Sequence, residues 1–166
     1  MAMVTSAMAD SIISSVNQST EAADAMNKFY KGLCDYVEAN AQAFYAWAGV
    51  NPSGTPDPQV VLECKIKTTG SLSPSGATDC TSALAIFSAD LNTQAALWQV
   101  VWPAGFALSP AFVIPTINIT PSMADNQHDA MNAVCAQIIA GLKLCTPTAA
   151  GAHAAYTGTA TFTQLI

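Results

Sequence analysis

Two long stretches of the chain carry no charged residue, namely residues 91–124 and residues 144–166. Thirteen of the sixteen charged side chains lie in residues 1–90, and only Asp125, Asp129 and Lys143 follow. A monomer in water normally keeps a charged surface, which prevents association. We therefore expect much of the second half to be buried or to contact neighbouring chains. The alternative is a globule whose neutral surface consists of Thr, Ser, Asn and Gln.

The composition limits the class of protein further. A chain of 166 residues with 51% apolar and 10% charged residues is long enough for one domain with a core and is too apolar for disorder. It has five lysines, no arginine and eleven acids, which give a net charge of −6. Phosphate recognition needs a basic patch, so we expect no nucleic-acid partner.

A membrane location is also not expected. The uncharged window from Ala95 to Ile114 has the length of a membrane span, but Pro103 and Pro110 interrupt it and no Lys or Arg lies near either end. Residues 1–16 have no basic region and contain polar residues within the apolar stretch, unlike a signal peptide. We expect a chain that is made in the cytoplasm.

The hydrophobic pattern predicts four helices and about three strands in a single α+β domain, residues 1–166. Apolar residues at helical spacing favour one helix in residues 3–16 and a long one in residues 20–48, so that residues 1–49 form a helical part. Residues 60–166 form a mixed part. It is expected to contain a strand at 60–68, a helix from a cap at Thr78 or Asp79 to about Val101, an extended segment at 112–120, a helix from Ser122 to Leu144 and a strand at 154–166. Residues 97–102 fit a strand as well as the end of the third helix.

The five cysteines show no spacing typical of a metal site. Cys34, Cys64 and Cys135 fall on apolar positions of the predicted elements, so we expect buried thiols there. A disulfide between the loop residues Cys80 and Cys145 is an alternative that the sequence does not decide.

No motif for catalysis, phosphate binding or zinc binding occurs, and we expect no catalytic residue, no cofactor and no metal. The two histidines, His128 and His153, are the candidates for a base or a metal ligand. His128 stands at helical spacing from Cys135 and near Asp125, which would suit a base or a metal ligand, but it also fits a polar first turn of a helix. His153 lies in a turn of small residues beside the last strand, where a local hydrogen bond is the more ordinary role.

The aromatic residues of the second half are the candidate contacts with other subunits. Their spacing fits a core or an interface. The candidate interface residues are Trp98, Trp102, Phe106, Phe112, Tyr156 and Phe162.

Three segments resemble small virion structural proteins of contractile-tailed bacteriophages. They are the Ser-Pro-Ser-Gly turn at 73–76, the amphipathic helix from Asn126 to Leu144, and the ending Gly-Ala-His-Ala-Ala-Tyr-Thr-Gly-Thr-Ala-Thr at 151–161. The resemblance implies a place in a tail, baseplate, neck or capsid surface, in many copies and without catalysis. It supplies no site residues.

We therefore expect a structural subunit of a virion that is assembled in the host cytoplasm and binds copies of itself and other virion proteins. The alternative is a small cytoplasmic enzyme or ligand-binding domain with an apolar pocket and His128 or His153 as its polar group. A membrane-associated or secreted interaction protein is the third hypothesis.

Overall fold

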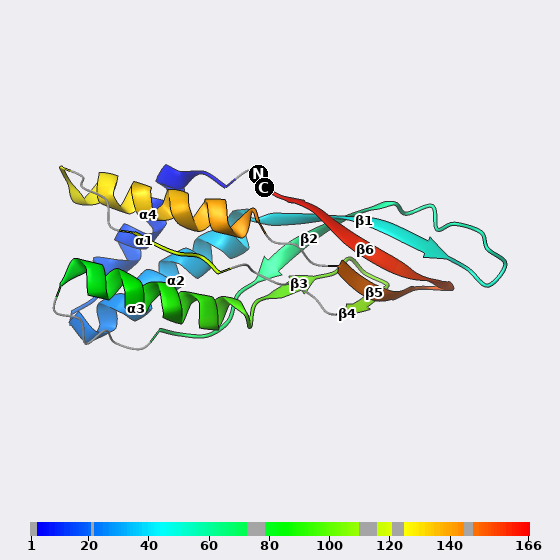
Figure 1. Cartoon of the computed structure of the whole chain (residues 1–166), viewed down its shortest axis with the longest axis horizontal. Coiled ribbons are helices and arrows are strands. Elements are labelled where there is room, and N and C mark those ends of the chain that lie inside the picture. The colour runs from blue at the N-terminus through cyan, green and yellow to red at the C-terminus, as the bar shows by residue number, and fades with distance from the viewer. Residues whose placement is uncertain (1–2, 21, 73–78, 110–115, 121–124, 145–147) are drawn as a thin grey trace.

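The computed structural model describes residues 3–20, 22–72, 79–109, 116–120, 125–144 and 148–166. Four helices gather at one end of an elongated molecule and a six-stranded antiparallel sheet extends from them (Figure 1). We call the helices the bundle and the strands the arm. The predicted α+β class and the four helices are confirmed, but the prediction of about three strands is wrong.

The helices are α1 (Thr5–Val16), α2 (Ala22–Asn40), α3 (Cys80–Ala95) and α4 (Gln127–Leu142). The strands are β1 (Gln42–Val50), β2 (Val61–Lys67), β3 (Gln99–Val101), β4 (Phe106–Ser109), β5 (Thr148–His153) and β6 (Tyr156–Leu165). Within the described residues, no helix is long and apolar enough to cross a membrane.

The long helix predicted for residues 20–48 is the main correction. Helix α2 ends at Asn40 and residues 42–50 form β1, the strand that pairs with both β2 and β6. The alanines and aromatics of this segment fit helical spacing and alternation equally well. Aromatic side chains favour strands, and here Tyr45 and Trp47 are buried on one face while Ala46 and Ala48 are exposed on the other.

Capping side chains set the starts of the two later helices. Asp79 accepts a hydrogen bond from the amide of Ser82 and caps α3, as predicted. Asn126 caps α4 through the amide of Asp129, so this helix begins at Gln127 and not at Ser122. Helix α3 ends at Ala95, and the alternative of a strand within 97–102 is confirmed by β3.

The bundle has an apolar core to which α1, α2 and α4 contribute. Helices α1 and α2 approach closely where Gly32 faces Ile12, and the Ser11 hydroxyl donates to the Gly32 carbonyl at 2.9 Å. The predicted apolar stripe of α4 is buried from Val134 to Leu142. Cys34, Cys64 and Cys135 are buried free thiols, as expected, whereas Cys145 and the side chain of Cys80 lie outside the described residues.

The sheet has the strand order β3-β2-β1-β6-β5-β4, so β3 and β4 are its two edges. The sequence joins these edges through residues 102–105 alone. Five residue steps reach at most about 18 Å, whereas the edges of a flat six-stranded sheet are about 24 Å apart. The sheet therefore curls, and its edges approach each other.

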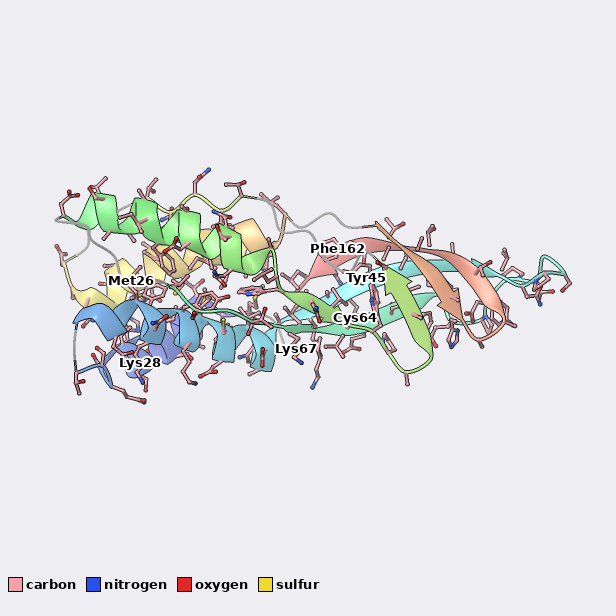
Figure 2. All side chains as sticks on the ribbon, turned by 90° about the horizontal axis from the view of Figure 1, so that it is seen from below. Met26, Lys28, Tyr45, Cys64, Lys67 and Phe162 are labelled. Carbon is pink, nitrogen blue, oxygen red and sulfur yellow. The ribbon has the colours of Figure 1, made fainter. Side chains whose placement is uncertain are left out.

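Aromatic side chains fill the concave face of the curled sheet. Tyr45 of β1 makes edge-to-face contacts with Trp102 at 4.7 Å and with Phe162 of β6 at 5.6 Å between ring centroids. Trp47 meets Phe106 in the same way at 5.4 Å, although their strands are three positions apart in the sheet. Figure 2 shows Tyr45 and Phe162 near each other in the arm, while the exposed Lys67 projects outward.

The final strand is central in the sheet. β6 pairs with β1 along one side and with β5 along the other. Both edges of this predicted strand are therefore paired within the chain. The predicted extended segment 112–120 lies partly outside the described residues. Its described part, 116–120, forms no strand, but Ile117 and Ile119 are buried as the alternation indicated.

A row of glycines crosses the middle of the curl. Gly49 of β1 faces Gly158 of β6, which faces Gly151 of β5. A Cβ on Gly158 would overlap the carbonyl oxygen of Ala48, and a Cβ on Gly49 would overlap the Trp47 ring. Glycine is therefore required for this close approach, which lets the strands bend around the aromatic core.

We expect Gly158→Ala to lower the free energy of unfolding by about 2–3 kcal/mol, because the backbone of β1 has to move. The control is Gly54→Ala in the β1–β2 loop, where φ is +82° but no atom lies within 4 Å of the new methyl group. Gly54→Ala should lower the free energy of unfolding by about 1 kcal/mol, because of backbone strain alone. Urea unfolding measures both, and an equal or smaller loss for Gly158→Ala would contradict the account.

Candidate functional site

A cluster of interactions between distant segments lies toward the tip of the arm, away from the bundle (Figure 1). The loop between β1 and β2, residues 51–60, meets the turn between β5 and β6 there. Trp47, Asp57, Phe106, His153 and Tyr156 form this tip cluster.

Asp57 is the hub of the tip cluster. Its side chain is 1% exposed, and its Oδ2 accepts hydrogen bonds from Trp47 Nε1 at 2.9 Å and from His153 Nδ1 at 2.6 Å. Its Oδ1 accepts from the amide of Gln59 at 3.0 Å, and its own amide donates to the Gly49 carbonyl at 2.8 Å. These bonds attach the loop to β1 and to β5.

The pKa of Asp57 reflects two opposing causes. Burial acts to raise it, but the hydrogen bonds from His153, from the Gln59 amide and from Trp47 outweigh burial and hold the pKa below the ordinary value of 3.8. The carboxylate is therefore ionised at neutral pH and favours a proton on His153 Nδ1.

His153 is held on both sides. Its imidazole stacks on the Phe106 ring at 3.9 Å between centroids, with 6° between the planes, and Tyr156 lies 6.5 Å away. The two-residue turn that follows places Ala154 at φ +51°, a conformation that costs a non-glycine residue energy. The side chain of His153 is 25% exposed.

The loop itself is ordered by its first residue. Asn51 Oδ1 accepts from the amides of Ser53 at 3.0 Å and Thr55 at 2.8 Å, and the Asn51 carbonyl accepts from Gly54. With Asp57 at its other end, the loop has fixed positions at both ends. A preorganised loop loses little conformational entropy when it binds a partner.

An ionised Asp hydrogen-bonded to a His is also half of a catalytic triad, which further needs a nucleophile beside the other nitrogen of the His. In the described part of the chain, no hydroxyl or thiol makes a hydrogen bond to His153 Nε2, and a Cβ added at Gly105 would lie 3.4 Å from this nitrogen. The arrangement that is present holds two loops together.

His128 has a different environment. It is half exposed on the first turn of α4, where Nε2 lies 3.1 Å from Asp10 Oδ1 of α1 and Nδ1 lies 3.0 Å from the Asn132 amide nitrogen. It does not contact Cys135, which is fully buried and whose pKa burial raises to about 12. Asp129 lies in the first turn, as expected, and Asp125 precedes the helix. No group of three potential metal ligands occurs among the described residues.

The candidate interface residues lie mostly inside the chain. Trp98 is 3% exposed and its Nε1 donates to the Tyr30 hydroxyl at 2.8 Å, so it belongs to the core between bundle and arm. Trp102, Phe106, Tyr156 and Phe162 are half buried on the concave face of the arm. Phe112 lies outside the described residues. Their availability to a neighbouring subunit stays a prediction.

Asp57 was not singled out from the sequence. One signal was present, because Asp57 is the only charged residue between Glu38 and Glu63 and stands in an otherwise neutral, proline-rich loop. The partner His153 is 96 positions away, so no local pattern connects the two.

Comparison with protein-family models, with curated proteins and with solved structures found no match for this chain.

We expect Asp57→Asn to lower the thermal midpoint at pH 7, because the amide cannot accept the same charge-assisted bonds. The pKa of Asp57 is lower in the folded chain than in the unfolded one, so its contribution to stability is full above about pH 4 and is lost as the pH falls below that value. The difference in midpoint between wild type and variant should therefore be largest at neutral pH and shrink as the pH is lowered through 3.8.

The control is Asp35→Asn, an exposed acid on α2 that pairs with Lys31. Surface pairs of this kind contribute little, so its midpoint should stay close to that of the wild type. A difference for Asp57→Asn that is constant with pH, or no larger than for Asp35→Asn, would contradict the role of the carboxylate.

Proposed function

We propose that this chain is a structural subunit of a multi-copy assembly, a bacteriophage virion, and that it serves as a building block of a tail, baseplate, neck or capsid surface without catalysing a reaction. It binds neighbouring subunits through its uncharged C-terminal half. The location in a virion rests on the resemblance of residues 73–76, 126–144 and 151–161. The assembly itself has an independent support in the distribution of charge.

The single observation that carries the proposal is the separation of charge between bundle and arm. The arm with its β1–β2 loop contains Asp57, Glu63, Lys65 and Lys67, whose charges cancel. The whole net charge of −6 therefore belongs to the rest of the chain, which is mostly the bundle. An acidic bundle keeps the chain soluble, and a neutral arm can approach another arm without repulsion.

A rigid tip agrees with such a role. The Asn51 turn and the Asp57 hydrogen bonds give the loop one conformation at the far end of the arm. A subunit that has to fit the same neighbour in many copies benefits from a contact surface that does not have to be ordered upon binding.

The alternative of a small enzyme or ligand-binding domain has less support. A cavity of about 280 Å³ lies between α2 and residues 68–71, where Asn27, Tyr30, Cys34 and Thr68 line it. A second cavity of about 350 Å³ lies between α3 and residues 116–119. Neither His128 nor His153 lines either cavity, so the polar group that this alternative relied on is not in place.

The test is the mass of the full-length chain in solution as a function of concentration and salt. We expect light scattering to give a weight-average mass that rises above 17.2 kDa with concentration. Raising the salt from 50 to 500 mM screens repulsion between the acidic bundles, so the association should strengthen. A 17.2 kDa monomer at every concentration and salt would contradict the proposal. So would the absence of this chain from purified particles of the phage that encodes it, measured by mass spectrometry.

A further inference from the structure

We infer that the convex face of the arm, over β1, β6, β5 and β4, is the contact between two copies of this chain. This inference rests on the proposed function and adds to it the surface and the partner. It also replaces the aromatic residues as the expected contact, because Trp102, Phe106 and Phe162 already pack against Tyr45 or Trp47 on the concave face.

The convex face is open to solvent in the single chain. The helices lie together at one end of the molecule, and the strands extend away from them (Figure 1). Strand alternation places Ala46, Ala48 and Val50 of β1 beside Thr161, Thr159 and Thr157 of β6, and all six are exposed. Across the next strands the face continues with the following exposed or half-buried residues: Ala150, Ala152, Ala107 and Ser109.

This face carries no charged side chain. The charged residues of the convex side, Glu63, Lys65 and Lys67, all belong to β2 and border it on one side. Burying an unpaired charge is costly, so β2 marks the limit of the contact. From Ala46 to Val50 and across the paired residues of β6, β5 and β4 the exposed side chains are small, so a second sheet can approach this part of the face to about 10 Å, whereas Phe44 and Gln164 lie on the same face nearer the bundle.

The absence of charge also selects the partner. A nucleic acid or a strongly charged protein finds no complementary charge on β1, β6, β5 or β4, whose only titratable side chains are the inward-facing Tyr45, His153 and Tyr156. A second copy of the same neutral face is complementary to it, because two-fold pairing brings identical patches together. Threonine methyl groups then meet alanine side chains, and the threonine hydroxyls can bond to one another across the contact.

The size of the face limits the affinity of the two copies for each other. Four strands at about 4.8 Å and five residues at about 3.3 Å give a footprint of about 300 Å² on each copy. This is well below the roughly 800 Å² per partner of a standard interface. We therefore expect a weak pair that forms at about 100 µM and not at 1 µM, and that is strengthened where many copies are held together.

The experiment is sedimentation velocity of the full chain from about 5 to 500 µM, with Thr159→Lys and Thr159→Glu as variants. Thr159 is exposed near the centre of the face, beside Ala48 and Ala150. Either variant alone should raise the dissociation constant of the pair at least tenfold through like-charge repulsion. An equimolar mixture of the two should restore pairing, because opposite charges then meet across the two-fold contact.

The matched control is Thr93→Lys, an exposed threonine of α3 that receives the same change of charge outside the four strands of the convex face. Its dissociation constant should stay within about twofold of the wild type, and circular dichroism should show that all variants are folded. A wild type that associates while Thr159→Lys associates equally well would overturn this inference and leave the proposed function standing. A wild type that is monomeric up to 500 µM would overturn both.

Discussion

The arm depends on aromatic contacts across the concave face of a sheet that extends away from the helices. Tyr45 and Trp47 of β1 reach Trp102, Phe162 and Phe106 from strands on either side. An open sheet would leave these rings in water, and their burial is the favourable term that bends the strands. The glycine row at Gly49, Gly158 and Gly151 permits the bend.

The tip and the convex face follow from this curl. Because the concave face closes on itself, Phe106 and His153 are brought over Trp47, and a loop carboxylate is then needed to accept the indole and imidazole protons. The opposite face is left with the alternate residues of the same strands. From Ala46 to Val50 and on the paired strands these residues are alanine, threonine, valine and serine, so the face that remains open is neutral and carries small side chains there.

Elements with one consistent pattern could be predicted from the sequence. The strand at 60–68, the final strand and the stripe of α4 each show a single periodicity, and each lies close to where it was expected. Residues 41–50 could not be assigned locally, because alanine spaced between aromatics satisfies both periods. Their strand form is decided by pairing with Val61–Lys65 and with β6, which is more than a hundred residues away. Strands β4 and β5 are short and rich in small residues, so their own sequence shows little alternation, and β4 pairs with a strand more than forty residues away.

The site was less predictable than the fold. The sequence predicted a local hydrogen bond for His153, but the bond that forms joins it to Asp57, 96 positions away, and its stacking on Phe106 is also a tertiary contact. The aromatic residues of the second half were expected in a core or an interface, and Trp98 lies in the core. Their position on the concave face depends on the curl of the sheet. The curl in turn depends on β1, which was predicted as part of a helix because its residues also fit helical spacing.

The most direct test of the account compares the two faces of the arm by NMR as the chain is concentrated from about 20 to 500 µM. The account predicts that methyl signals of Ala46, Ala48, Thr159 and Thr161 shift with concentration, and that a mixed labelled and unlabelled sample gives contacts between copies at these methyl groups. The indole signals of Trp47 and Trp102 should stay in place. Shifts confined to the indoles, or to residues of the helices, would contradict the claim that the aromatics hold the arm together and leave its neutral face for a second copy.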